Sequence, residues 1–201
     1  MPTRTDEGRT PATQRPGSPR YGRPMTTTDP LEGIEALPDE MVFKPGALPE
    51  LFIADAWGDD DDRYYIPLGP GVGSKPIWIS PSKNAWVDIL RAENAGLLQR
   101  HYHPHDVFGL CISGRWRYLE HDWVATAGSF IYESPGESHT LVVEESGEPM
   151  RTMFHVNGPL IWLDDDWNPS GIHDAFSVIE MTRAHYEAVG IGADHVDTLI
   201  R

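Results

Sequence analysis

Two segments decide the fold of this chain: GLLQRHYHPHDVFGLCISG at residues 96–114 and GSFIYESPGESHTLVV at residues 128–143. Both contain short runs of β-branched and aromatic residues between glycine, serine or proline, and the sequence on either side has the same character. The expected strands cover residues 77–80, 85–92, 97–103, 107–113, 115–121, 129–132, 140–144, 150–157 and 160–163. Short, closely spaced strands separated by turn residues are typical of an all-β sandwich or barrel.

Three histidines in these segments predict a metal site. His101 and His103 are two residues apart, so on a β-strand both side chains point to the same face. His139 follows the turn at Pro135-Gly136 and opens the next strand, so it can supply a third imidazole. Neutral imidazole suits iron, zinc, copper and nickel, and three protein ligands leave positions open for water, oxygen or a substrate. This pattern favours a catalytic centre over a purely structural one.

The spacing of these residues resembles the two motifs of the cupin superfamily. The first motif, commonly G-x5-H-x-H-x3,4-E-x6-G, is matched by Gly96, His101, His103 and Gly114, with four residues instead of five after the first glycine. The second, commonly G-x5-P-x-G-x2-H-x3-N, is matched by three residues and departs at two others. The matches are Gly128, Gly136 and His139; Pro135 stands one place late, and Val143 replaces the asparagine. The resemblance implies a single-domain, all-β cupin barrel, also called a jelly roll or double-stranded β-helix.

One departure bears on the metal site. Many cupins use the glutamate of the first motif as a fourth ligand, and Val107 occupies that position here. A valine cannot bind a metal. The resemblance therefore implies a three-histidine cupin, the kind found in dioxygenases that bind iron(II) and cleave C–C bonds of diketones or hydroxyketones.

The runs GRWRYLEHDWVATAGSFIYESPGESHTLVV (114–143) and HYEAVGIGADHVDTLIR (185–201) look like the 2,4'-dihydroxyacetophenone dioxygenase family of cupins. The match extends from about residue 51 to the C-terminus. It implies that an aryl hydroxymethyl ketone and O2 are converted to an aryl carboxylate and formate. It also implies Fe2+ on His101, His103 and His139, with Zn2+, Ni2+ or Mn2+ as alternatives.

Other polar residues are candidates for contacts with a substrate. Alternation along residues 115–120 places Tyr118 and Glu120 on one face, and Glu120 is the candidate for proton transfer. Tyr118, Tyr132 and His155 are the candidates for substrate binding. Glu120, Tyr118 and Tyr132 have a competing interpretation, since a residue at the surface or rim of the barrel would show the same pattern. His155 is expected to lie in the core or beside the metal ligands rather than to be a fourth ligand.

Two other functions remain open. The chain could be another cupin enzyme, such as a β-diketone-cleaving dioxygenase or an isomerase, because one fold supports several reactions. It could also be a metal-binding, ChrR-like sensory cupin without turnover, of the kind found in anti-sigma factors.

Composition limits the partners. The formal net charge of −15 disfavours nucleic-acid binding, because an acidic surface repels phosphates. No apolar run approaches the roughly 18 residues of a membrane span, and no secretory signal is evident. A single cysteine, Cys111, cannot form an internal disulfide, so we expect a cytoplasmic protein. The expected partners are a small aromatic or diketone substrate, O2 and further copies of the chain in a dimer or tetramer.

The chain divides into four expected regions. Residues 1–30 form a disordered arm, because residues 1–24 contain five prolines, three glycines and five arginines and little that could be buried. Residues 31–75 form an N-terminal extension with an edge strand, residues 76–165 the cupin barrel, and residues 166–201 a helical segment packed on the barrel. In that segment Asp174 is the expected N-cap of a helix, Gly190 and Gly192 end it, and a second short helix covers residues 194–200.

Overall fold

The computed structural model describes residues 33, 35, 36, 38, 42, 44–58, 61–98 and 100–201. The arm expected over residues 1–30 lies outside the described residues. The chain divides into two units, residues 1–47 and 48–201, and all the strands described below belong to the second. In the described part of the chain, no helix has the length and apolar character needed to cross a bilayer.

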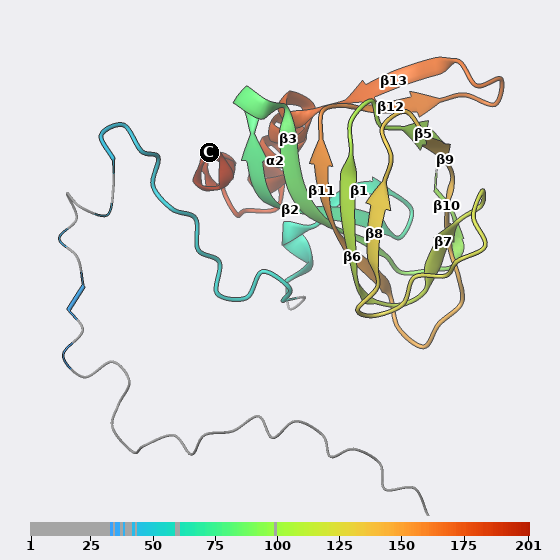
Figure 1. Cartoon of the computed structure of the whole chain (residues 1–201), viewed down its shortest axis with the longest axis horizontal. Coiled ribbons are helices and arrows are strands. Elements are labelled where there is room, and N and C mark those ends of the chain that lie inside the picture. The colour runs from blue at the N-terminus through green and yellow to red at the C-terminus, as the bar shows by residue number, and fades with distance from the viewer. Residues whose placement is uncertain are drawn as a thin grey trace, which may run out of the picture. The chain divides into compact units, whose positions relative to one another are not determined.

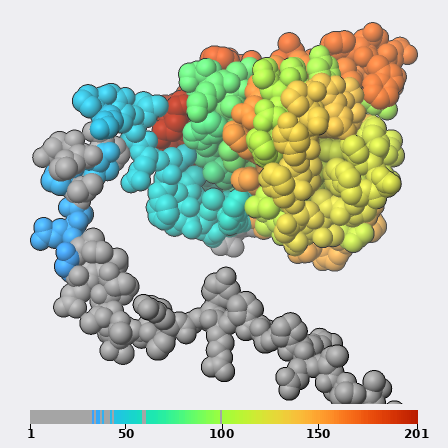
Figure 2. All heavy atoms as spheres, in the orientation of Figure 1, coloured from blue at the N-terminus to red at the C-terminus, as the bar shows by residue number. Residues whose placement is uncertain are grey.

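The second unit is built from antiparallel sheets that surround a common core (Figure 1). The larger sheet has six strands in the order β1 (Ile66–Gly69), β2 (Val72–Ser80), β3 (Ala85–Ala92), β11 (Met150–Asn157), β6 (Val107–Ser113) and β8 (Phe130–Glu133). Figure 2 shows the atoms of these strands side by side on one face, from the green of β2 and β3 to the gold of β8.

Two smaller sheets complete the barrel. One contains β4 (Gly96–Leu97), β10 (Leu141–Val143) and β7 (Trp116–Tyr118), and the other contains β13 (Pro169–His173), β12 (Leu160–Leu163), β5 (His101–Tyr102) and β9 (Ser138–His139). The order β3-β11-β6-β8 places strands from opposite ends of the chain beside each other, as a jelly roll requires. The expected all-β cupin fold is confirmed.

The strands follow the sequence pattern closely where that pattern is regular. β3, β6, β11 and β12 have the expected bounds. The strand expected over residues 97–103 is instead divided, because β4 pairs with β10 whereas β5 pairs with β12 and β9. The segment therefore crosses from one sheet to another, and a strand cannot keep its hydrogen-bond ladder through such a corner.

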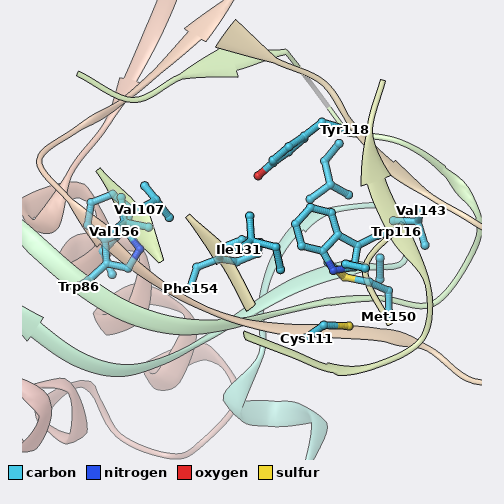
Figure 3. Packing of buried hydrophobic residues seen from close by; sticks show 14 of the residues in the cluster. Trp86, Val107, Cys111, Trp116, Tyr118, Ile131, Val143, Met150, Phe154 and Val156 are labelled. Carbon is cyan, nitrogen blue, oxygen red and sulfur yellow. The ribbon is translucent and has the colours of Figure 1, made fainter. Parts of the chain in front are cut away.

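Alternating burial along the strands fills the barrel. In β11, Met150, Thr152, Phe154 and Val156 are buried and the residues between them are half-buried. Trp116 is fully buried and contacts Phe154 edge-to-face, with ring centroids 5.7 Å apart. Figure 3 shows Trp116, Met150, Phe154 and Val156 between the sheets. Burying each large apolar side chain contributes about 1.5–3 kcal/mol, so this row is a main source of stability.

The C-terminal segment contains the expected helix, α2 (Ala175–Ala188). Its N-cap is Asp174, whose carboxylate accepts a hydrogen bond from the Ser177 backbone N–H at 2.9 Å, while the Ser177 hydroxyl accepts one from the Asp174 N–H at 2.7 Å. This reciprocal capping box starts the helix. A 3-10 helix, Ala193–Leu199, follows. The segment expected to be helical from residue 166 differs in its first part, where β13 pairs with β12.

Candidate metal centre

Strand pairing brings the three histidines together. In the register of β5 and β9, His101 lies directly opposite His139, and their Nε2 atoms are 3.2 Å apart. His103 follows β5 on the same side, and one ring nitrogen from each histidine lies within 4.8 Å of the others. The structure therefore gathers the three predicted ligands at one point.

All three imidazoles are buried, with exposed fractions of 8% for His101, 4% for His103 and 1% for His139. Burial, and then the neighbouring His101, lower the pKa of His103 to about 3 and that of His139 to about 2. Desolvation disfavours the charged imidazolium, and adjacent cations would repel one another. Near neutral pH the rings of His103 and His139 are therefore neutral, which is the state that binds a metal.

A carboxylate stands beside the histidines. Glu133 Oε2 lies 3.6 Å from His103 Nε2 and 3.5 Å from His139 Nε2. Its other oxygen, Oε1, accepts a hydrogen bond from the Tyr118 hydroxyl at 2.5 Å. Oε2 is buried and accepts no hydrogen bond from any described residue. Burial raises the pKa of Glu133 to about 7, against the lowering effect of the Tyr118 hydrogen bond.

Register explains why the glutamate is found on β8. Val107 of β6 pairs with Glu133 of β8, so their side chains share the inner face of the sheet. The place where the cupin motif expects a glutamate is thus apolar, and the neighbouring strand supplies a carboxylate to the same region. Glu133 is not among the site residues predicted from the sequence. Alternation along FIYE, where Ile131 and Glu133 are buried and Phe130 and Tyr132 are exposed, was the available signal.

Aromatic rings hold the imidazoles in place. The Tyr118 ring is stacked on His139 with centroids 3.8 Å apart and planes within 10° of parallel. Trp162 contacts His101 edge-to-face at 5.4 Å. These contacts restrict rotation of the histidine rings, which a preorganised ligand set needs.

The donor set fits a divalent cation. Three imidazole nitrogens and one carboxylate oxygen without a hydrogen-bond donor among the described residues converge in a buried place. Leaving such a carboxylate oxygen unsatisfied is costly, and a cation would offset the cost. Imidazole and carboxylate together suit iron, manganese, nickel or zinc. His101, His103 and His139 would hold the ion, and Glu133 stands within reach as a further ligand or as a base.

The site opens into a cavity of about 630 Å³. His101, His103 and Glu133 form one part of its wall. Most of the remaining wall is apolar and includes Leu90, Leu98, Phe154, Leu160 and Met181. An apolar chamber with a few polar groups at one point is the usual form of a small-molecule site.

Of the other residues predicted for the site, some line the cavity and others lie outside it. Tyr118 lines the cavity. Glu120 is exposed beyond the end of β7, where its carboxylate accepts a hydrogen bond from the Thr140 backbone N–H at 2.8 Å. It lies outside the cavity because the strand, and with it the alternation, ends at Tyr118.

Tyr132 and His155 lie on the outer face of the large sheet, where both rings contact Phe108. His155 is one residue out of phase with Phe154 and Val156, which point inward. Neither ring lines the cavity that His101 and His103 line, but Tyr132 lines a smaller neighbouring pocket together with Tyr118, Glu133 and His139. His173, which was not among the residues predicted for the site, lines this cavity and contacts Trp86 edge-to-face at 5.5 Å.

Comparison with known proteins agrees with this description. An RmlC-like cupin protein from Ralstonia eutropha JMP134 has a TM-score of 0.60 and 30% identity, over 66% of this chain and 88% of that protein. An acetylacetone dioxygenase from Acinetobacter johnsonii has a TM-score of 0.57 and 17% identity, over 69% of this chain and 98% of that protein. A search of curated proteins by sequence gave no significant match.

The family model described as the ChrR Cupin-like domain matches residues 54–161, which is more than half of the chain. The matched span includes all three histidines and Glu133. The chain belongs to the ChrR cupin-like family of the cupin superfamily.

Proposed function

We propose that the chain is an iron(II)-dependent dioxygenase that cleaves an aryl hydroxymethyl ketone, such as 2,4'-dihydroxyacetophenone, between the carbonyl and hydroxymethyl carbons. Ar–CO–CH2OH and O2 would give Ar–COOH and HCOOH, with all atoms of both reactants retained. The observation that carries the proposal is the buried cluster of three histidines and Glu133 at the wall of an apolar cavity.

The cavity suits such a substrate in size and polarity. A volume of about 630 Å³ lies in the range of small-molecule sites. The polar ketone end would lie at the histidines, and the aryl ring would contact the apolar wall. When bound, iron(II) would supply Lewis-acid polarisation of the ketone and the redox chemistry that allows O2 to react.

Glu133 is the group of this chain that is best placed to move a proton. Its Oε2 faces the space beside His103 and His139, where the hydroxymethyl group of a substrate would lie. There it would accept a proton from that group and later return it to the product. The Tyr118 hydroxyl orients the carboxylate by donating to Oε1. Geometry of this kind is the first requirement for a general base.

Two alternatives use the same histidines. The fold that the chain shares with an acetylacetone dioxygenase supports a β-diketone as the substrate, and the ChrR-like family supports a sensory protein that binds metal without turnover. The resemblance of residues 114–143 and 185–201 to the dihydroxyacetophenone dioxygenase family favours the hydroxyketone.

Oxygen uptake separates these functions. The full chain is loaded anaerobically with iron(II) or zinc(II) and mixed with 2,4'-dihydroxyacetophenone or acetylacetone in an oxygen electrode. We expect uptake with iron only, faster with the hydroxyketone, and formate as a product. Faster uptake with acetylacetone would support the diketone alternative. Metal binding without uptake for either substrate would refute the dioxygenase.

Matched variants test the roles of the residues. His139→Ala should lose bound metal, whereas Glu133→Gln should retain most of the metal and lose at least tenfold in kcat, since a general base typically contributes 100-fold or more. His155→Ala is the control, because this histidine lies on the outer face of the same sheet. It should retain both metal and activity. Full activity in Glu133→Gln would remove Glu133 from the mechanism.

A further inference from the structure

A second carboxylate, Asp88, points into the cavity from a different wall. Asp88 lies in the middle of β3 and pairs with Phe154 of β11, which points into the core. Residues opposite each other in an antiparallel pair share a face, so the Asp88 side chain also points inward. It lines the same cavity as His101 and His103.

The Asp88 carboxylate accepts hydrogen bonds from two side chains, Ser74 on β2 and Trp86 on β3. The Ser74 hydroxyl donates a hydrogen bond to Asp88 Oδ2. Burial raises the pKa of this aspartate to about 6, against the lowering effect of the Ser74 hydrogen bond. A half-buried carboxylate in a mostly apolar cavity reduces stability even with these hydrogen bonds, so its presence there points to recognition of a ligand.

Sheet geometry places Asp88 far from the candidate metal centre. β3, β11, β6 and β8 are successive neighbours, and the row Trp86, Val156, Val107 and Glu133 crosses them. Neighbouring strands are ~4.8 Å apart, so the backbones of β3 and β8 are separated by about 14 Å. Asp88 is one inward position along β3 from Trp86, whose place relative to Val107 and Val156 is visible in Figure 3.

This separation matches the length of a small aryl ketone. A side chain reaches a few ångströms from each backbone, which leaves room for one aromatic ring between the two carboxylates. The wall between them is apolar, with Phe154, Val156 and Leu160 among its residues. A flat ligand with a polar group at each end would therefore satisfy both ends of the cavity.

We propose that Asp88 determines specificity by accepting a hydrogen bond from a hydroxyl group at the end of the substrate remote from the ketone. This inference rests on the proposed function and narrows its substrates to aryl ketones with a distal hydroxyl. A hydroxyl fits better than an ammonium group, because a cation loses far more hydration on entering an apolar cavity. His173, which also lines the cavity, has its pKa lowered by burial and adds no competing positive charge.

Ligand binding tests the role of Asp88 without turnover. The full chain loaded with zinc is titrated with 4-hydroxyacetophenone, 4-methoxyacetophenone and acetophenone, and binding is followed by calorimetry. The wild-type protein should bind the hydroxyl compound about tenfold or more tightly than the methoxy compound, as expected for a hydrogen bond to a charged acceptor. Asp88→Leu should abolish this preference, and Asp88→Asn, which keeps the size and an acceptor oxygen, should reduce it.

Control variants distinguish a role of Asp88 in binding from an effect on folding and from an effect on the dioxygenase reaction. Asp165→Asn, at an exposed aspartate after β12, should keep the wild-type preference. If Asp88→Leu fails to fold, the ratio of the two affinities in Asp88→Asn decides. Equal binding of the hydroxyl and methoxy compounds by the wild type, or an unchanged ratio in Asp88→Asn, would overturn the inference. A preference that depends on Asp88 in a protein with no oxygen uptake would support Asp88 and refute only the dioxygenase.

Discussion

Asp88 should make the protein less stable as the pH rises from 4 to above 6. Its pKa is raised to about 6 in the folded chain from an ordinary value of 3.8. The folded state therefore holds this proton more tightly than the unfolded state. The stabilisation is fully present below the unfolded pKa and is lost as pH rises through the folded pKa. The two pKa values differ by about 2, and at ~1.4 kcal/mol for each pKa unit the loss is about 3 kcal/mol.

The assay is urea unfolding of wild type and Asp88→Asn at intervals between pH 4 and pH 8, both free of metal. Asparagine can still accept the Ser74 hydrogen bond but does not ionise. The variant should therefore gain about 2 kcal/mol relative to wild type between pH 4 and pH 7, because part of the loss already occurs below pH 4. Asp165→Asn serves as the control with no such gain. A difference between Asp88→Asn and wild type that stays constant across this range would refute the reasoning.

Three further predictions concern the site and the turns. Tyr118→Phe should lose about 1–3 kcal/mol of unfolding free energy in urea melts and lower kcat, because Glu133 Oε1 loses its buried donor. His139→Ala dialysed against iron(II) should contain less than a tenth of the wild-type metal by elemental analysis. Gly114→Ala should cost roughly 3 kcal/mol, because φ is +74° and a Cβ would lie 2.5 Å from the Met150 Cα, whereas Gly136→Ala, at φ +82° with open space, should cost only about 1 kcal/mol.

The features that were predicted correctly are those that a short stretch of the sequence determines by itself. β3, β6, β11 and β12 follow regular runs of β-forming residues between turns, and α2 begins at a capping box that can be read in the sequence. The three histidines could be assigned because a two-residue spacing fixes a common face. Their convergence required one long-range assumption, that β5 and β9 pair, and the cupin motifs supplied it.

Where the prediction and the structure differ, the difference arises from pairing between strands that are not adjacent in the sequence. His155 is on a strand that was correctly expected, but the phase of that strand relative to the cavity is set by its neighbours. β13 has the sequence PSGIH, with little β-branched character, and forms because β12 offers it a free edge. Asp88 and His173 reach the cavity from β3 and from the end of β13, which lie outside the two motifs.

The pairing of Val107 with Glu133 shows how a motif can depart from its pattern while the site keeps its chemistry. In an antiparallel pair, two opposite side chains occupy neighbouring positions on the same face, about 5 Å apart at Cβ. A carboxylate lost from one strand can therefore be replaced from the other at little cost in geometry. Glu133 stands 3.5–3.6 Å from two of the imidazoles, and its second oxygen is held by Tyr118. The cupin motifs predict the three histidine ligands, whereas only the pairing of β6 with β8 reveals the carboxylate of Glu133 beside them.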